Sequence, residues 1–167
     1  MPMKLGKSEC TILDLVQRQG RMTNVELARA ANLSESACLR KIKALEKSGV
    51  ITGYRAELEP RKLGLGISAY VLVNLDQRSE TDTSEFFDAL QHEPRVIECA
   101  AITGPDDLLL RVVARDMDDL AELTMAGILS FPSVKDISSC VVMKEIKTLA
   151  PLPVVDIPVI KGEAMDH

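Results

Sequence analysis

The 167-residue chain is predicted to fold as an α+β protein with two structured parts. Up to about residue 47, apolar residues recur at helical spacing in three separable segments. After about residue 67, short apolar runs of strand length alternate with two helical patterns. Chain-breaking residues separate the two patterns: Pro60, Gly64 and Gly66. We therefore expect domains over 1–60 and 61–148, followed by an extended tail over 149–167 that contains three prolines.

The first two helical segments have clear end signals. The first runs from about Lys7 to Gln19 and stops before Gly20, because glycine is a common helix terminator. The second opens with Thr23 followed three residues later by Glu26. This spacing is typical of a capping box, in which the threonine hydroxyl caps a backbone N–H and the glutamate reaches back.

The third helical segment follows the second after a very short turn, Asn32-Leu33-Ser34. Ser34 is a suitable N-cap, and the helix is expected to continue to about Lys47 before Gly49. Two helices joined by about three residues, with one buried leucine in the turn, form a helix-turn-helix. Residues 50–58 then read as two short extended runs around Gly53, which predicts a small hairpin or wing.

The second part has the element order βαββαβ, which predicts a ferredoxin-like sandwich. Expected strands cover 68–75, 96–103, 108–113 and 134–144, and expected helices cover 84–91 and 117–130. The first helix should bury Phe86, Phe87 and Leu90. Such a sheet is covered by helices on one face only, so its other face invites a partner sheet.

Composition is that of an ordinary globular protein, with 46% apolar and 27% charged residues. The sequence has neither an apolar run of membrane-spanning length nor the apolar core of a signal peptide, so no membrane partner and a cytoplasmic location are expected. The cysteines stand far apart and form no CxxC pair: Cys10, Cys38, Cys99 and Cys140. We expect reduced, mostly buried thiols, with no metal site and no cofactor.

The net charge of -5 hides an asymmetry between the two parts. Residues 1–60 hold ten Lys or Arg against seven Asp or Glu, whereas residues 61–167 hold ten against eighteen. The first part therefore carries +3 and the rest -8. A basic module joined to an acidic body suits a phosphate-binding end attached to a domain that stays off nucleic acid.

A helical wheel of the third helix separates an apolar stripe from a basic face. At about 100° per residue, Cys38, Ile42, Leu45 and Gly49 fall within about 40° of one direction. Ser36, Arg40, Lys43 and Lys47 lie roughly opposite, with Lys41 at their flank.

The basic face has the residue types that a DNA-reading helix needs. Hydroxyl and guanidinium groups near its N-terminal half can reach base edges or phosphates, and the later lysines can meet the phosphate backbone. The predicted double-stranded DNA contacts are Ser34, Ser36, Arg40, Lys41, Lys43 and Lys47, with Arg55 in the wing as a weaker phosphate contact. The alternative is a solvated lysine face, which the preceding capped helix, the tight turn and the local positive charge disfavour.

The run GRMTNVELARAANLSESACLRKIKALEKSGVITGYRAELEP closely resembles the N-terminal domain of the Lrp/AsnC, or feast/famine, transcriptional regulators. The βαββαβ half resembles the amino-acid-sensing domain of that family, so the resemblance spans about residues 4–147. It implies dimers formed through the C-terminal sheets, assembly to tetramers, octamers or larger rings, and DNA binding altered by an amino acid bound between dimers. One departure is Ser34-Glu35-Ser36-Ala37-Cys38 where the family often has SPTPC, and Glu35 adds a negative charge that should change the preferred operator.

The family's effector loop has the form GDxDYLL, and this chain has GPDDLLL from Gly104 to Leu110. The resemblance implies effector-binding residues Gly104, Asp106, Asp107 and, on the last strand, Ser139. In this loop carboxylates would meet an amino group and backbone N–H groups a carboxylate. Gly-Pro-Asp-Asp is also good turn chemistry by itself, so an ordinary hairpin turn is the alternative.

The expected function is therefore sequence-specific DNA binding under the control of an amino acid or related metabolite. Two other classes stay open. Some haem-pathway decarboxylases have a similar two-domain arrangement, but they need acid/base residues, and the only histidines are His92 and His167, so no catalytic residue is predicted. An architectural protein that wraps DNA with little sequence choice is disfavoured by the acidic total charge.

Overall fold

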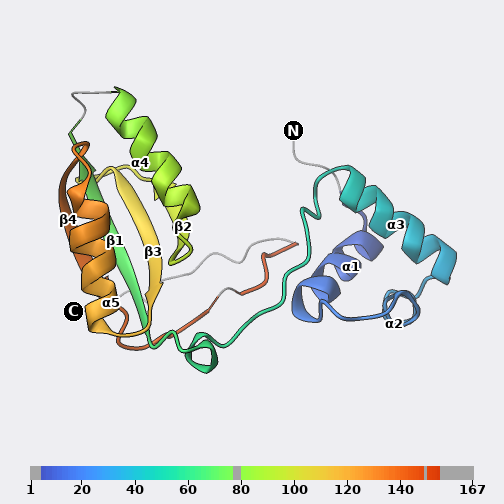
Figure 1. Ribbon diagram of the computed structural model, residues 1–167. Helices are drawn as coiled ribbons and strands as arrows, with labels where there is room; N and C mark the ends of the chain where they lie inside the picture. The colour runs from blue at the N-terminus through green and yellow to red at the C-terminus, as the bar shows by residue number, and fades with distance from the viewer. Residues whose placement is uncertain (1–4, 77–79, 149, 155–167) are drawn as a thin grey trace, which may run out of the picture. The chain divides into compact units, whose positions relative to one another are not determined.

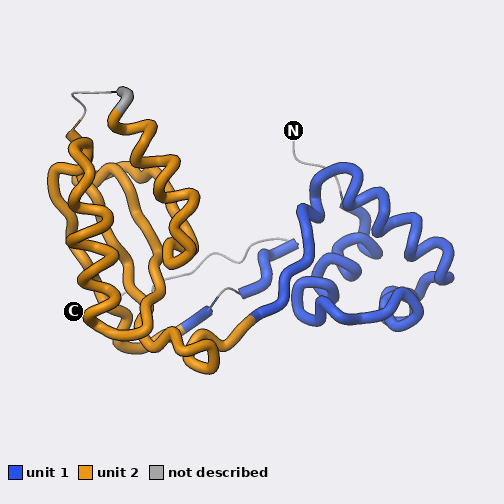
Figure 2. The backbone as a smooth tube through the Cα atoms, in the orientation of Figure 1, with its two compact units in different colours: residues 1–57, 147–167 blue, residues 58–146 orange. Residues whose placement is uncertain are grey.

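A computed structural model of the chain describes residues 5–76, 80–148 and 150–154. These residues form two compact units (Figure 2). The helical unit comprises residues 1–57 together with the C-terminal residues 147–167, and the sheet unit comprises residues 58–146. Among the described helices, none combines the length and the apolar composition needed to span a bilayer.

The helical unit contains the three predicted helices, α1 (Lys7–Arg18), α2 (Asn24–Ala30) and α3 (Glu35–Lys47) (Figure 1). The predicted capping box of α2 is confirmed: the Glu26 carboxylate accepts from the Thr23 N–H at 2.7 Å, and the Thr23 hydroxyl accepts from the Glu26 N–H at 3.3 Å. Ser34 is the N-cap of α3, where its hydroxyl accepts from the Ala37 N–H. These caps satisfy backbone donors that no helical carbonyl can reach, and they therefore set where each helix begins.

The turn between α2 and α3 is tight because Asn32 adopts a left-handed conformation, with φ of 54°. The Leu33 N–H then donates to the Ala28 carbonyl at 2.9 Å. The Asn24 amide at the start of α2 donates to the Glu35 carbonyl at 3.0 Å and joins the first turns of the two helices. The helix-turn-helix prediction is confirmed, and α2 and α3 share a small apolar core with α1. The buried members of this core are Ile12, Leu13, Leu27, Ala28, Cys38 and Leu45.

The predicted hairpin over residues 50–58 is wrong in its local structure, because this segment is extended and forms no strand ladder. A two-residue hairpin turn requires backbone with positive φ. Gly53 is absent from the positive-φ glycines of the described chain, so the segment does not reverse there. The N–H groups of Val50 and Ile51 donate instead to the Leu45 carbonyl, and the chain continues into a short 3-10 turn at Pro60–Leu63.

The sheet unit confirms the predicted βαββαβ order. Its elements are β1 (Ile67–Leu75), α4 (Glu80–His92), β2 (Val96–Ala101), β3 (Leu108–Ala114), α5 (Met117–Ala121) and β4 (Val134–Val141). The strands form one antiparallel sheet in the order β2-β3-β1-β4. Val71, Leu110, Phe86 and Leu120 belong to one core, so α4 and α5 pack on the same face of the sheet (Figure 1).

Several details of this unit differ from prediction, including α4, which begins at Glu80 rather than 84, and β2, which ends at Ala101 rather than 103. Phe87 is 39% exposed while Phe86 and Leu90 are buried, since residues four apart share a helix face and Phe87 falls outside it. The segment 117–130 is not one helix, because α5 passes into a wider π-type turn over Glu122–Gly127 and then a 3-10 turn. Strand β4 ends at Val141 rather than 144, because its ladder with β1 ends at the pair Ala69 and Val141.

The thiols are also more exposed than predicted. Cys38 is buried in the helical core and Cys10 is intermediate, but Cys99 and Cys140 are exposed. Both exposed cysteines lie on edge strands, β2 and β4, where one side of the strand has no neighbour. Cys140 also pairs with Tyr70, on the face of the sheet that the helices do not cover.

A buried carboxylate ties together the turn between β3 and α5. The side chain of Asp119 is 4% exposed and accepts from the Arg115 backbone N–H at 2.8 Å, and it pairs with the guanidinium groups of Arg95 at 2.8 Å and Arg115 at 3.2 Å. The Arg115 side chain and backbone, followed by Arg95, hold the pKa of Asp119 well below its usual range. This network was not predicted from the sequence.

Candidate functional site

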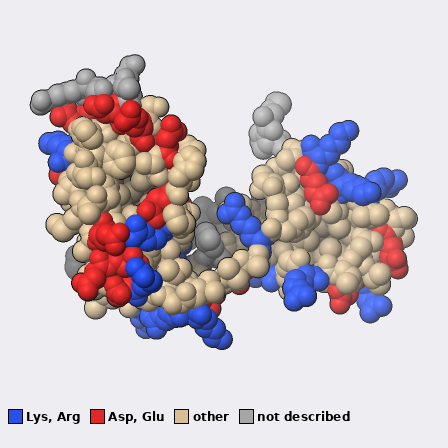
Figure 3. All heavy atoms as spheres, viewed as in Figure 1, with Lys and Arg blue, Asp and Glu red and all other residues tan. Residues whose placement is uncertain are grey.

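The exposed face of α3 carries the four residues that the helical wheel selected. Ser36, Arg40, Lys43 and Lys47 are all exposed, whereas Cys38 and Leu45 on the opposite side are buried. On the side of the molecule drawn in Figure 3, Lys and Arg side chains gather over α3. The geometry therefore matches the predicted surface, and the DNA-binding role of each residue stays a prediction.

The N-terminus of α3 adds hydroxyl groups and backbone donors next to that face. The hydroxyls of Ser34 and Ser36 lie 3.3 Å apart, and either one can donate. Free N–H groups in a helix's first turn, together with the helix dipole, attract an anion such as a phosphate. Glu35 in the same turn is exposed and opposes that attraction.

Lys41 does not join the exposed group. Its Nζ lies 2.9 Å from Oε1 of Glu9, and both side chains are only about a quarter exposed, at 29% and 26%. The other carboxylate oxygen of Glu9 accepts from the Gly6 N–H at 2.6 Å and caps α1. The Gly6 hydrogen bond and then Lys41 lower the pKa of Glu9. Lys41 thus links α3 to the start of α1, and sequence spacing alone did not indicate this pairing.

Lys41→Met is expected to leave the salt dependence of DNA binding unchanged and to lower the free energy of unfolding by up to about 1 kcal/mol, because it removes an ion pair inside the domain. Lys43→Met, the matched variant on the exposed face, should reduce the salt slope by about 1 and leave stability unchanged. Fluorescence anisotropy across a salt series and thermal unfolding measure the two effects. An equal loss of slope in both variants would assign Lys41 to the DNA surface.

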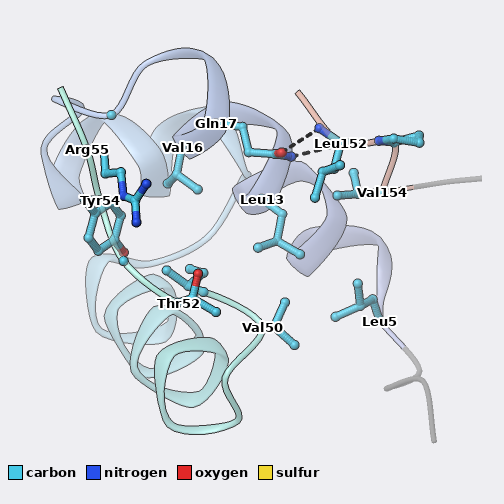
Figure 4. A pocket seen from close by; sticks show the side chains of 14 residues that line it. Leu5, Leu13, Val16, Gln17, Val50, Thr52, Tyr54, Arg55, Leu152 and Val154 are labelled. Carbon is cyan, nitrogen blue, oxygen red and sulfur yellow. Dashed lines mark hydrogen bonds between the residues drawn. The ribbon is translucent and has the colours of Figure 1, made fainter. Parts of the chain in front are cut away.

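Arg55 lies apart from the α3 group. It lines a pocket of the helical unit together with residues of α1, next to Tyr54 (Figure 4). The Tyr54 hydroxyl donates to the Glu46 carboxylate at 3.0 Å, and this bond fixes the segment against α3. Because the hairpin is not formed, Arg55 is not held at a wing tip.

The exposed surface of α3 includes one apolar residue that the predicted DNA contacts do not contain. Leu39 is 43% exposed on α3 and lies about 60° from Ser36 around the helix. An exposed leucine beside Arg40 offers apolar contact of the kind that recognises a thymine methyl group. Its absence from the buried stripe was the signal that could have identified it.

The loop between β2 and β3 contains the predicted effector residues, and its carboxylates are bonded to the end of β1. Asp107 accepts from the Leu75 N–H at 2.8 Å, and Asp106 accepts from the Asn74 amide at 3.3 Å. Gly104 has φ of 131°, a conformation that favours glycine. An ordinary hairpin turn makes contacts of the same kind.

Asn74 and Asp136 were not predicted, yet they adjoin this loop. The Asn74 amide donates to Asp106 and, at 2.8 Å, to Asp136 on β4. Asn74 and Asp136 are paired across the β1–β4 ladder. Three aspartates thus gather at one end of the sheet, although in the described part of the chain no acidic, histidine or cysteine group is arranged to hold a metal ion.

The structure does not bring Ser139 together with this loop. Ser139 pairs with Val71, three positions along β4 from Asp136, which is about 10 Å of strand. Side chains three residues apart in a strand point to opposite faces, so Ser139 is on the helix-covered side and Asp136 on the other. Of the two histidines, His92 lies with its Nδ1 2.7 Å from the Asp88 carbonyl, and His167 falls outside the described residues.

Family models match both parts of the chain. Residues 7–52 match the model described as winged helix-turn-helix DNA-binding, and residues 68–152 match the Lrp/AsnC ligand binding domain. The chain is 36% identical over 143 residues to the leucine-responsive regulatory protein of Haemophilus influenzae, with 86% of each chain covered. It is 27% identical over 154 residues to the transcriptional regulator AzlB of Bacillus subtilis, covering 92% of this chain and 98% of that one.

Among solved structures, the chain is similar to a transcriptional regulator from Neisseria meningitidis in complex with L-methionine. The TM-score is 0.87 at 36% identity, with 90% of this chain and 97% of that chain covered. An AsnC family regulator from Agrobacterium tumefaciens gives a TM-score of 0.82 at 27% identity, with 90% and 97% covered. These four relatives are all named as regulators.

Proposed function

The chain belongs to the Lrp/AsnC family of DNA-binding transcriptional regulators, and from this we propose that α3 reads a specific duplex sequence and that an amino acid bound by the sheet unit alters that reading. The observation that carries the proposal is the exposed row Ser36, Arg40, Lys43 and Lys47 on the second helix of a helix-turn-helix. We infer a regulatory rather than an enzymatic role from the relatives.

Arg40 is the residue we assign to a base edge, because its guanidinium can donate two parallel hydrogen bonds to guanine. Ser34 and Ser36 contact bases or phosphates at the helix N-terminus, where the dipole favours an anion. Lys43 and Lys47 contact phosphates and supply affinity without sequence preference. Leu39 packs against a thymine methyl group. Lys41 acts inside the domain, and Arg55 acts on phosphates only at the edge of the interface.

For the effector we propose an amino acid at the β2–β3 loop. The Neisseria meningitidis relative was solved with L-methionine, and the Haemophilus influenzae relative is named as leucine-responsive. The carboxylates of Asp106, Asp107 and Asp136 offer negative charge to the ligand's ammonium group, and the backbone around Gly104 offers donors to its carboxylate. Ser139 is outside this group, and Asn74 contributes in its place by positioning two of the aspartates.

The same proposal includes a homodimer formed through the open face of the sheet. Tyr70 lies between Cys140 and Arg111 in the ladder, and Leu72 lies opposite Leu109, so alternate residues present a partly apolar surface away from the helices. An exposed apolar sheet face of this kind is stabilised by a second sheet. Mass measurement by light scattering tests this part and gives the size of any larger assembly.

Selection of duplexes from a random pool, followed by footprinting, tests the DNA-binding proposal. We expect a recovered consensus and a few protected sites in phase with the helical repeat, because major-groove contacts discriminate bases. Uniform protection without a consensus would support the architectural alternative instead.

A thermal-shift screen against the twenty amino acids tests the effector proposal. A ligand at 100 times its Kd should stabilise the fold by about 2.7 kcal/mol, since it binds the native state only. Asp106→Asn should remove the shift, whereas Asp88→Asn on the exposed side of α4 should keep it. If no amino acid shifts either protein, the loop is an ordinary turn and the effector proposal fails.

A further inference from the structure

A pocket of about 640 Å³ lies in the helical unit, on the α1 side. The pocket is lined by α1 with its flanking residues Leu5 and Gly20, by the extended residues 50–55, and by residues 152–154 of the C-terminal tail (Figure 4). Leu13 and Val16 of α1 contribute aliphatic walls. The tail therefore belongs to the helical unit, although the chain enters it from the end of the sheet unit.

One side chain on α1 holds the tail by its backbone. The Leu152 N–H donates to Oε1 of Gln17 at 2.7 Å, and Nε2 of Gln17 donates to the Leu152 carbonyl at 3.2 Å (Figure 4). A primary amide that contacts both polar backbone groups of one residue imitates a neighbouring β-strand. A third contact follows, from the Cys10 thiol to the Val154 carbonyl at 3.4 Å.

The tail sequence suits this mode of binding. Pro151 and Pro153 lack backbone N–H groups, so within Pro151-Leu152-Pro153 the only donor is the one that Gln17 accepts. Proline also restricts the backbone to extended conformations, which lowers the entropy lost on docking. The side chain of Leu152 is 75% exposed, whereas Val154 packs against the core of the helical unit. The helical unit thus recognises the tail through the backbone of Leu152 and the side chain of Val154.

We propose that the groove formed by α1 and residues 50–55 is a receptor for the extended tail segment 151–154 of the same chain, and that the docked tail is a strap that stabilises α1 in the DNA-binding unit. Because the tail belongs to the helical unit, the chain passes between the two units twice, once near residue 57 and once near residue 147. The contacts of the strap involve neither the exposed face of α3 nor the β2–β3 loop, so the strap is independent of DNA reading and of effector binding.

Cysteine labelling of the full-length protein tests the strap. The Cys10 thiol contacts the strap, while Cys38 is completely buried in the same unit and reports unfolding. In Gln17→Ala the rate of Cys10 alkylation by iodoacetamide should rise roughly tenfold. The variant loses two hydrogen bonds to the tail, and each of them changes the docking equilibrium by about tenfold or less. Val154→Asp and truncation after Thr148 should raise it further, with Cys38 protected throughout. Peptide mass spectrometry separates the two thiols.

Two matched controls and an add-back make the test decisive. Gln19→Ala, at the exposed residue that follows α1, and Leu152→Ala, which removes an exposed side chain and keeps the backbone, should leave the Cys10 rate unchanged. A synthetic peptide of residues 148–158 should restore protection to the truncated protein. If truncation also exposes Cys38, the full-length Gln17→Ala result decides. An unchanged Cys10 rate in Gln17→Ala and Val154→Asp would overturn the strap, and a rate that rises on dilution would assign the groove to the tail of a second copy.

Discussion

Arg40→Ala is expected to weaken binding to the selected duplex by roughly 10- to 100-fold at fixed salt, which is the range for one lost bidentate base contact. Arg40 is exposed at the centre of the α3 surface, one helical turn from Ser36 and from Lys43. No part of the domain core depends on it, because the inward stripe of α3 is formed by Cys38, Ile42 and Leu45. Loss of the guanidinium should therefore change recognition without changing the fold.

The measurement is anisotropy titration against the selected duplex and against single-base variants of it. Arg40→Ala should also reduce discrimination at one base pair, and Arg40→Lys should keep the charge but not the discrimination, because an ammonium lacks the planar pair of donors. Lys62→Ala, at an exposed lysine of the sheet unit, is the control with full affinity. Unchanged affinity and salt slope for Arg40→Ala would remove α3 as the reading helix.

Asp119→Asn is expected to lower the melting temperature of the sheet unit by several degrees at neutral pH. The carboxylate is almost inaccessible and is paired with both Arg95 and Arg115, and asparagine leaves two guanidinium groups without their anion. Arg95 keeps a second partner, because its Nε lies 2.9 Å from Glu93, which limits the loss on that side. The exposed neighbour Asp118→Asn is the matched control and should melt as the parent protein does.

The same substitution should change how stability depends on pH. Since the folded-state pKa of Asp119 lies below its unfolded value of about 3.9, the network stabilises the fold fully above that value and loses this contribution as the pH falls through the folded-state pKa. The difference in melting temperature between parent and Asp119→Asn should therefore be constant near neutrality and shrink on acidification below about pH 4. A difference that grows at acid pH would contradict the pairing.

Patterns within single elements predicted much of this protein. The capping box at Thr23, the Ser34 cap and the wheel of α3 depend on residues within one or two turns of each other. These predictions agree with the structure, except that Gly49 of the predicted apolar stripe is exposed and lies beyond the end of α3. The βαββαβ order likewise follows from the length and spacing of apolar runs, so it too was predictable without coordinates. Local hydrogen bonding and periodicity are encoded by neighbours in the chain, which is why the sequence alone sufficed.

The tertiary structure decided the features that join distant residues. Lys41 contacts Glu9 at a sequence separation of 32 residues, Gln17 contacts Leu152 at 135, and Arg95 contacts Asp119 at 24. No helical or strand periodicity predicts pairs at such sequence separations. The family resemblance placed Ser139 near the loop. The strand register shows that its side chain lies on the helix-covered face, opposite to that of Asp136. The sequence by itself determined which face of α3 is exposed and basic, and this is the face that we propose reads DNA. Long-range packing settled which charged and polar groups form contacts within the fold. Each such contact depends on where the whole chain places its two partners.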